Sequence, residues 1–376
     1  MIKYIISHPI QYQVPLIRYL SKKIKIEVAY RSNISLKPFY DKEFDKNVVI
    51  QKNLIKGYKN YFLKHIGSNK VNAIFPITTE FKSLFSDNTK IIWLHGIKNW
   101  YNLIVIVISK FHNKKVFVRD EINNLKKRSF LNKFLNKVFF YIIDDFIDCY
   151  LSIGIENTNT LKKYGINKKK IFNVPYVVDN KFFYLKKKNV QQKLKILFTG
   201  KLIHKKGCDI LLKSIFLLNK KNDFKNKTDV IIVGEGNLKN NYLELKKKLN
   251  LNNVKFCGFK NQNLIKKYYN NSNLFIMPSR EENWGLAVNE AMASSNAIIC
   301  SNSVGCSKNL VKNNFNGYIF KSDDYIDLAR KIFMFYKNPS RINLFAKNSL
   351  KIISKHSFNE CYAGIIKAIN HVNKKC

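Results

Sequence analysis

The chain has 376 residues, 46% of them apolar, which is enough for a large buried core and excludes an intrinsically disordered protein. Its formal net charge is +42, but the basic excess is shared almost evenly by the two halves, so no basic arm or stripe marks a nucleic-acid-binding protein. The seven cysteines show no CxxC spacing, which indicates reduced thiols and no zinc site.

Apolar runs with strand character alternate with helical patterns along the whole chain, which predicts parallel sheets covered by helices. Predicted strands of the first half lie near residues 3–7, 26–30, 73–76, 91–94, 115–119 and 149–152. Those of the second half lie near residues 195–199, 229–233, 254–257, 274–277, 297–300 and 317–320. The polar stretch after Asp179, within residues 174–192, is typical of a linker.

We therefore expect an α/β protein of two Rossmann-like, doubly wound domains with a cleft between them. The first spans residues 1–185 and the second residues 190–356, and a C-terminal helix of about residues 357–376 is expected to pack back on the first. The first strand is too short for a signal peptide, and the longest apolar run, residues 103–108, is too short for a membrane span. These patterns predict a cytoplasmic protein whose contact with a membrane is at most peripheral.

Residues 126–143 form a helical pattern with one apolar face and with Lys133 and Lys137 away from it. The apolar face contains Phe130, Leu131, Phe134, Leu135, Val138 and Ile142. Such a helix can lie on an anionic bilayer or pack on its own sheet, and the period alone favours the sheet.

Two lysines, Lys201 and Lys206, stand in the turn between the strand at 195–199 and a helix that begins at Cys208. Ammonium groups in such a turn can neutralise a diphosphate and stabilise it as a leaving group. The alternative is that both are solvated charges of a lysine-rich chain. Further along, Gly234 and Gly236 predict a tight turn, because the full dinucleotide-binding fingerprint is missing.

Two carboxylates, Glu282 and Glu290, flank the turn between the strand at 274–277 and a helix from Leu286. Ligands of open α/β sheets bind at this edge, where the backbone N–H groups of Trp284, Gly285 and Leu286 would point at an anion. Carboxylates beside an anion site suit a ligand with hydroxyl-rich parts, such as a sugar nucleotide. For Glu290 the alternative is an ordinary carboxylate near a helix N-terminus.

In the first half, His8, His95 and Arg119 each follow or end a predicted strand, so each is expected at the carboxyl edge of a sheet. A lone histidine is more often structural than functional. For Arg119, an internal salt bridge with the neighbouring Asp120 or Glu121 explains the residue almost as well as a ligand contact.

Read in order, several segments resemble the C-terminal domain of GT-B fold glycosyltransferases, specifically the retaining glycosyltransferase family 4, also called group 1. The segments are FTGKLIHKKGCDILL, VIIVGEGNLKN, VKFCGFK, YNNSNLFIMPSREENWGLAVNEAMASSNAIICS and VKNNFNGYIF, within residues 194–330. The N-terminal SHPIQYQVPL (7–16) resembles a subgroup whose first loop reads His-Pro-Ile-Gln-Tyr. Many family members have arginine where this chain has Lys201. Arginine can donate two hydrogen bonds to a phosphate, whereas the ammonium group of lysine acts as a point charge.

The resemblance implies a catalytic role for four side chains. Lys201 and Lys206 would hold the donor diphosphate, and Glu282 would accept hydrogen bonds from the transferred sugar. His95 would contact that sugar near the reacting carbon.

The resemblance also implies the residues around the two substrates. Glu290 would bind the ribose diol, and the rest of the donor would be bordered by Trp284, Gly285, Leu286, Gly258, Phe259 and Lys260. On the acceptor side it implies His8, Gln11 and Arg119. Trp284 stands where the family frequently has phenylalanine.

The predicted reaction is sugar transfer, with retention of the anomeric configuration, from a UDP- or GDP-sugar to an acceptor hydroxyl. The expected acceptor is a lipid-linked, polysaccharide or lipopolysaccharide precursor. No DxD motif follows a predicted strand, so neither a metal nor a cofactor beyond the nucleotide-sugar co-substrate is expected. The alternatives are a nucleotide-sugar epimerase or phosphorylase of the same architecture, and a basic nucleic-acid-binding protein.

Overall fold

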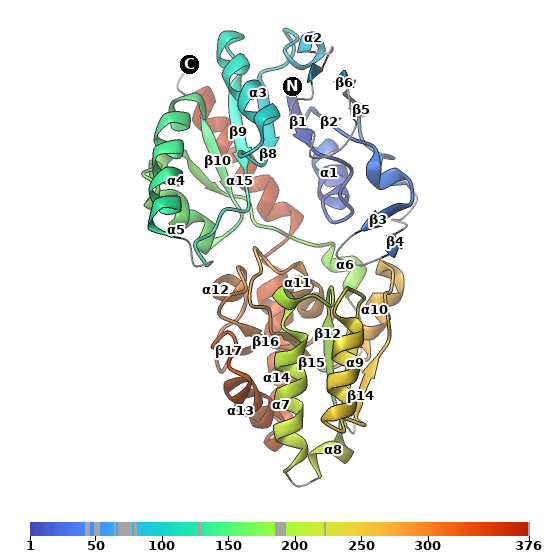
Figure 1. The fold of residues 1–376 in the computed structure, drawn as a ribbon. Coiled ribbons are helices and arrows are strands. Elements are labelled where there is room, and N and C mark those ends of the chain that lie inside the picture. Colours follow the sequence, from blue (N-terminus) through green and yellow to red (C-terminus); the bar gives the residue numbers. More distant parts are fainter. Residues whose placement is uncertain are drawn as a thin grey trace. The chain divides into compact units, whose positions relative to one another are not determined.

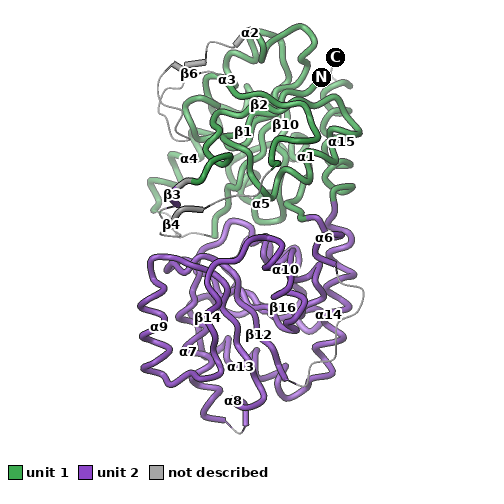
Figure 2. The backbone as a smooth tube through the Cα atoms, turned by 90° about the vertical axis from the view of Figure 1, so that its right-hand side faces the viewer, with its two compact units in different colours: residues 1–39, 47–178, 358–376 green, residues 40–46, 179–357 purple. Residues whose placement is uncertain are grey.

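The computed structural model describes residues 1–41, 46–48, 53–63, 65–66, 77–78, 81–125, 129–184, 193–221 and 223–374. These residues form two compact units, which Figure 2 colours separately. Unit 1 comprises residues 1–39, 47–178 and 358–376, and unit 2 comprises residues 40–46 and 179–357. The strand expected at 73–76 and the expected domain limits at residues 185 and 190 lie outside the described residues.

Within the described residues, unit 1 contains a seven-stranded parallel sheet in the order β11-β10-β9-β8-β1-β2-β5. Its strands are β1 (Ile2–Ile6), β2 (Ile26–Tyr30), β5 (Asn60–Phe62), β8 (Ile91–His95), β9 (Lys115–Arg119), β10 (Cys149–Ser152) and β11 (Ile171–Asn173). Strand β1 is apolar apart from Lys3 and is buried along its whole length, as expected for a central strand covered on both faces. Two further strand pairs are short, β3 (Phe39–Asp41) with β4 (Lys46–Val48) and β6 (His65–Ile66) with β7 (Ile77–Thr78).

Helices cover both faces of this sheet (Figure 1). They are α1 (Val14–Ser21), α2 (Phe81–Leu84), α3 (Trp100–Phe111), α4 (Phe130–Ile143), α5 (Ile155–Lys163) and α15 (Phe358–Asn373), with the 3-10 turns η1 (Ile34–Leu36), η2 (Asp144–Phe146) and η3 (Lys168–Lys170). Because side chains of a strand alternate between faces, Ile92 and Leu94 join the core under α3, α4 and α5, whereas Ile91 and Trp93 join the core under α1 and α15. The last helix therefore belongs to the core of unit 1.

Unit 2 contains a six-stranded parallel sheet in the order β14-β13-β12-β15-β16-β17 among its described residues. The strands are β12 (Leu194–Thr199), β13 (Thr228–Val233), β14 (Val254–Phe256), β15 (Leu274–Met277), β16 (Ala297–Ser301) and β17 (Gly317–Phe320). The helices are α6 (Asn180–Phe183), η4 (His204–Lys206), α7 (Cys208–Asn219), α8 (Phe224–Lys227), α9 (Lys239–Lys248), α10 (Gln262–Asn270), α11 (Leu286–Ala293), α12 (Ser307–Leu310), α13 (Tyr325–Lys337) and α14 (Ser340–Ile353). The predicted fold class, two Rossmann-like α/β domains, is confirmed.

The expectation that the apolar face of residues 126–143 packs on its own sheet is wrong. In α4 only Phe140 and Ile143 are buried, and the six apolar residues assigned to that face are exposed. The helix is attached through a different, narrower strip of its surface, which the period of the apolar residues does not distinguish. Among the helices of the described residues, none is long and apolar enough to cross a bilayer.

Candidate active site

The loops after β12, β13, β14 and β15 lie together at the carboxyl edge of the unit 2 sheet. Because the strands are parallel, all four loops leave the sheet at this edge. The backbone N–H of Gly234 donates to the carbonyl of Gly258 over 3.0 Å, and the N–H of Arg280 donates to the carbonyl of Lys205 over 2.8 Å. Phe259 and Lys260 follow in the same half-buried loop as Gly258. The structure thus brings the predicted donor-binding segments to one edge of one sheet.

The glycine pair after β13 allows two of these loops to touch. A Cβ atom on Gly234 would lie 1.8 Å from the carbonyl oxygen of Gly200, so only glycine permits this approach. The N–H of Leu202 also donates to the carbonyl of Glu235 over 2.7 Å. This turn therefore supports the backbone beside Lys201.

Lys206 and Glu282 form a direct ion pair, with both side chains half-buried. Lys206 ends η4, and Glu282 lies in the loop after β15, where its carbonyl accepts the N–H of Gly305 over 3.0 Å. The cation predicted for the diphosphate and the carboxylate predicted for the sugar hydroxyls are thus in contact.

Lys201 forms a second ion pair, with Asp41, at 3.0 Å. Asp41 ends β3 and belongs to residues 40–46, which group with unit 2 although they lie far away in the sequence. Sequence reasoning missed this partner, because nothing in a charged stretch indicates which basic residue an aspartate will pair with in the fold. The two predicted diphosphate ligands are therefore each held by a carboxylate.

Glu290 accepts a hydrogen bond from the hydroxyl of Tyr269 over 2.8 Å, and that hydroxyl lies 2.8 Å from the hydroxyl of Thr199. Burial raises the pKa of Glu290 to about 7 although the hydrogen bond from Tyr269 opposes the shift. Glu290 is the fifth residue of α11, past the first turn where a helix dipole acts most strongly. The carboxylate is thus held by a tyrosine that the sequence did not single out.

The turn before α11 orients Trp284 inward. Its buried indole N–H donates to the amide oxygen of Asn289 over 3.0 Å, and its carbonyl accepts the N–H of Cys306 over 2.8 Å. Gly285 follows with a φ of +101°, a left-handed conformation that favours glycine, and Leu286 begins the helix. Any contact of Trp284 with a donor is therefore expected through its backbone and not its ring.

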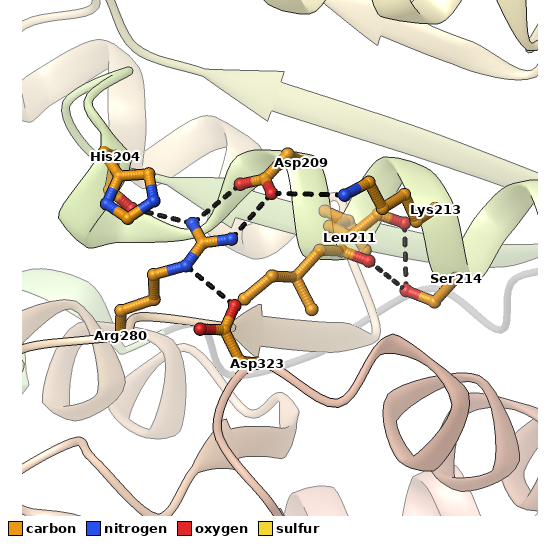
Figure 3. Close-up of polar contacts among 8 residues, drawn as sticks. His204, Asp209, Leu211, Lys213, Ser214, Arg280 and Asp323 are labelled. Atoms are coloured by element: carbon orange, nitrogen blue, oxygen red, sulfur yellow. Dashed lines mark hydrogen bonds and ion pairs between the residues drawn. The ribbon is translucent and has the colours of Figure 1, made fainter.

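Arg280 ties the loop after β15 to the turn after β12, and Figure 3 shows its bonds to His204, Asp209 and Asp323. Its guanidinium donates to both carboxylate oxygens of Asp209 over 2.8 and 2.7 Å, to the carboxylate of Asp323 over 2.8 Å and to the carbonyl of His204 over 2.9 Å. Burial alone would raise the pKa of Asp209, but the hydrogen bonds and charge of Arg280 hold it below its usual value.

Sequence reasoning missed the part played by Arg280. The available signal was the scarcity of arginine, which occurs seven times in this lysine-rich chain and once inside the carboxylate turn. A bidentate arginine is the residue type that fixes a carboxylate rigidly.

In unit 1, His95 lies in a cluster of polar side chains at the carboxyl end of β8. Its ring nitrogens are 3.4 Å from the hydroxyl of Tyr4, 3.2 Å from the amide nitrogen of Gln13 and 3.4 Å from the hydroxyl of Tyr176. Tyr176 also donates to Glu121 over 2.7 Å. Burial, helped by the charge of Arg119, lowers the pKa of His95 to about 3, so its imidazole is neutral near pH 7.

The three residues predicted on the acceptor side have different surroundings. His8 and Gln11 are half-buried in the loop between β1 and α1, and a ring nitrogen of His8 lies 3.0 Å from the hydroxyl of Ser7. Arg119 is fully buried and donates to the carbonyls of Val174 and Pro175 over 3.0 and 2.8 Å. Its contact with an acceptor stays a prediction.

Comparison with known proteins points to one family for the second half of the chain. Residues 180–352 match the family model described as Glycosyl transferases group 1. An N,N'-diacetylbacillosaminyl-diphospho-undecaprenol alpha-1,3-N-acetylgalactosaminyltransferase of Campylobacter jejuni is 27% identical over 264 residues, 69% of this chain and 66% of that protein. An uncharacterized glycosyltransferase of Methanocaldococcus jannaschii is 26% identical over 177 residues, 47% of this chain and 48% of its own.

The solved structures resemble the whole chain in fold. HepE of Anabaena, crystallised in complex with UDP, matches with a TM-score of 0.74 at 13% identity, over 98% of this chain and 99% of its own. In sequence, by contrast, the chain spans between about half and two thirds of the length of the relatives named above. The matched segment, residues 180–352, is therefore similar to a glycosyltransferase domain of group 1.

Proposed function

We propose that the protein transfers a sugar, with retention, from a nucleoside-diphosphate sugar held by unit 2 to an acceptor hydroxyl. The observation that carries this proposal is the direct pairing of Lys206 with Glu282 at the carboxyl edge of the sheet. A ligand whose diphosphate adjoins a hydroxyl-rich sugar needs a cation and a carboxylate side by side. Glu290, further along the same turn and helix, suits the ribose diol at the other end of such a ligand.

In this proposal Lys201 and Lys206 neutralise the charge that develops on the diphosphate as the bond from the anomeric carbon to the phosphate oxygen breaks. The acceptor oxygen forms its bond on the same face of the sugar, and the departing phosphate oxygen takes the acceptor proton. Glu282 accepts hydrogen bonds from the sugar hydroxyls and orients the reacting carbon. The neutral imidazole of His95 is proposed to contact the same sugar. No step of the proposed reaction uses a metal ion.

The proposed donor is a UDP- or GDP-sugar, and the proposed acceptor is a lipid-linked or polysaccharide precursor. Two similar proteins support these classes: HepE of Anabaena binds UDP, and the Campylobacter jejuni enzyme acts on a diphospho-undecaprenol acceptor. Fold likeness alone does not carry specificity from one protein to another.

The proposal is tested by incubating the protein with UDP- and GDP-sugars and short glycan or lipid-linked acceptors, and by assigning the anomeric configuration of the product by NMR. Glu282→Ala should lower kcat by about 100-fold or more, because it removes a group that orients the reacting sugar. The neighbouring Glu281→Ala is the matched control and should keep near wild-type activity. Conversion of the donor into an isomeric nucleotide sugar without any acceptor would identify an epimerase and overturn the transferase proposal.

A further inference from the structure

Helix α4 carries an apolar face that points away from the body of unit 1. At about 100° per residue along a helix, its outward residues fall within an arc of about 140°. Between 54% and 85% of each side chain is exposed for Phe130, Leu131, Phe134, Leu135, Tyr141 and Ile142. The two buried residues, Phe140 and Ile143, lie on the opposite side of the helix.

Helix α3 carries a similar stripe. Trp100, Ile104, Val107 and Phe111 follow at intervals of four, three and four residues, which places them on one line along the helix. Their side chains are 37% to 83% exposed, whereas Tyr101, Val105 and Ile106 of the same helix are buried. Each helix therefore has one apolar side that packs in the core and a second apolar side that is exposed to solvent.

The two helices lie on the same side of the unit 1 sheet. Buried residues of α3 and of α4 belong to one core cluster, under the same face of the sheet. The ammonium group of Lys98, just before α3, donates to Asn136 of α4 and lies 5.8 Å from the centre of the Phe139 ring. The outward stripes of α3 and α4, here called the α3–α4 face, are thus carried by two helices that cover one face of the sheet and are linked through Lys98.

The charges around the α3–α4 face are mostly positive, although Asp144 and Asp145 follow α4 directly and Asp148 pairs with Lys110 of α3 over 3.2 Å. Between residues 88 and 143 the sequence contains two acidic residues, Asp120 and Glu121. Both are engaged within unit 1, Asp120 by the N–H of Ile97 over 2.6 Å and Glu121 by Tyr176. Lys98, Lys133 and Lys137 are exposed beside the apolar stripes. A partner for this face must be apolar and negatively charged.

We propose that the α3–α4 face docks unit 1 on an anionic lipid bilayer. An anionic bilayer offers both properties: acyl chains for the apolar stripes and phosphate headgroups for the lysines. A second copy of the chain is a poorer occupant, because each copy carries a net charge of +42. The docking goes beyond the proposed transfer reaction, since the donor-binding residues of unit 2 take no part in it.

Trp100 supplies a direct probe of docking. The chain has three tryptophans, and Trp93 and Trp284 are 0% and 3% exposed whereas Trp100 is 61% exposed. We expect the full-length protein to show a blue shift of its emission, and protection from acrylamide, with vesicles of phosphatidylglycerol and phosphatidylcholine. The Trp100→Phe variant should lose the spectral change and still float with the vesicles.

Matched variants separate this surface from exposed apolar residues in general. Phe111→Ser, Phe130→Ser and Phe134→Ser together should lower vesicle partitioning by about tenfold or more, because each removes apolar area that the bilayer buries. The control combines Leu243→Ser, Leu264→Ser and Leu344→Ser, at exposed positions of unit 2, and should partition like the wild type. Thermal melts followed by circular dichroism verify that both triple variants fold.

The charge component has its own pair of variants. Lys133→Gln with Lys137→Gln should weaken binding to anionic vesicles and reduce its dependence on salt, whereas Lys247→Gln with Lys248→Gln on α9 should change it less. Absence of binding to anionic vesicles would overturn the proposal. So would an equal loss in the two triple variants, or a sedimentation-detected dimer that the serine variants dissociate. Binding of UDP-sugars should be the same in all variants, so failure of docking leaves the transfer proposal standing.

Discussion

Glu290 illustrates how the surroundings of a side chain set its pKa. Its half-buried carboxylate accepts a hydrogen bond from the hydroxyl of Tyr269, and burial raises its pKa from 4.5 to about 7. An acid whose pKa is higher in the folded state binds its proton more tightly there than in the unfolded chain. The folded state therefore loses stability as the pH rises from about 4.5 to about 7.

This linkage predicts that Glu290 makes the free energy of unfolding depend on pH. Between pH 5 and 8 the free energy of unfolding of the wild type should fall by about 3 kcal/mol relative to that of Glu290→Gln, since a pKa shift of one unit corresponds to about 1.4 kcal/mol. Urea unfolding of both proteins across this range measures the difference, in which the contributions of Asp120 and His95 cancel. Parallel pH profiles of the two proteins would contradict the raised pKa.

Asp41 competes with the proposed diphosphate for Lys201. The pair at 3.0 Å is partly solvated, so it is expected to stabilise the fold by less than about 1 kcal/mol. Asp41→Asn should therefore tighten the binding of UDP or GDP, by up to about fivefold in Kd, because Lys201 no longer satisfies a carboxylate. Calorimetric titration measures this change. Weaker binding in the variant would mean that Asp41 positions Lys201 for its ligand.

At the scale of elements, the geometry of the candidate site depends on how loops are tied to one another. The loop after β15 and the turn after β12 meet through Arg280, whose four hydrogen bonds reach Asp209, Asp323 and the carbonyl of His204. None of these partners is a neighbour of Arg280 in the sequence. The contact between Lys206 and Glu282 is therefore supported by a residue that is expected to touch no substrate.

Replacing this anchor should affect both stability and donor binding. Arg280→Lys should lower the free energy of unfolding by about 2 kcal/mol, because it loses charged hydrogen bonds to Asp209, and should raise the KM for the donor. Arg330→Lys, on an exposed position of α13, is the matched control. Donor titration and denaturant unfolding are the measurements. If Arg280→Lys keeps the donor KM of the wild type, the loop geometry does not depend on the anchor.

At the scale of the whole molecule, unit 1 is completed by the last helix of the chain. Cys361, Ile365, Ala368 and Val372 of α15 are buried in the same core cluster as residues of β1, β8 and α1. A Cβ atom on Gly364 would lie 2.0 Å from the carbonyl oxygen of Asn173, so α15 approaches β11 closely. Folding of unit 1 thus needs both ends of the sequence.

This arrangement predicts that a cavity in α15 destabilises unit 1. Ile365→Ala removes three carbons from a fully buried side chain and should lower the free energy of unfolding of unit 1 by about 3 kcal/mol. The exposed Leu344→Ala on α14 should change stability by less than about 0.5 kcal/mol. Hydrogen exchange in the amides of β1 and β8 reports on unit 1 by itself. Unchanged protection there would contradict a structural role for α15.

Much of the fold was readable from local patterns. Strands β2, β9, β10, β15 and β17 have the predicted limits, and other predicted strands within the described residues are shifted by about one residue. The short edge strands β5 and β11 were not predicted, because three residues are too few to show a period. For the candidate site, the paired carboxylates and lysines were found from residue type and spacing. Their roles toward a donor stay predictions.

Residue type and spacing alone determined that the chain alternates strands with helices and that Lys206 and Glu282 each stand in a loop after a predicted strand. Both properties are local, since they depend on side-chain period and on the order of elements. The tertiary structure alone decided that these two side chains touch, that Arg280 joins their loops, and that the apolar face of α4 is exposed. The physical reason is that a helical period shows that an apolar face exists, whereas its covering depends on residues far away in the chain.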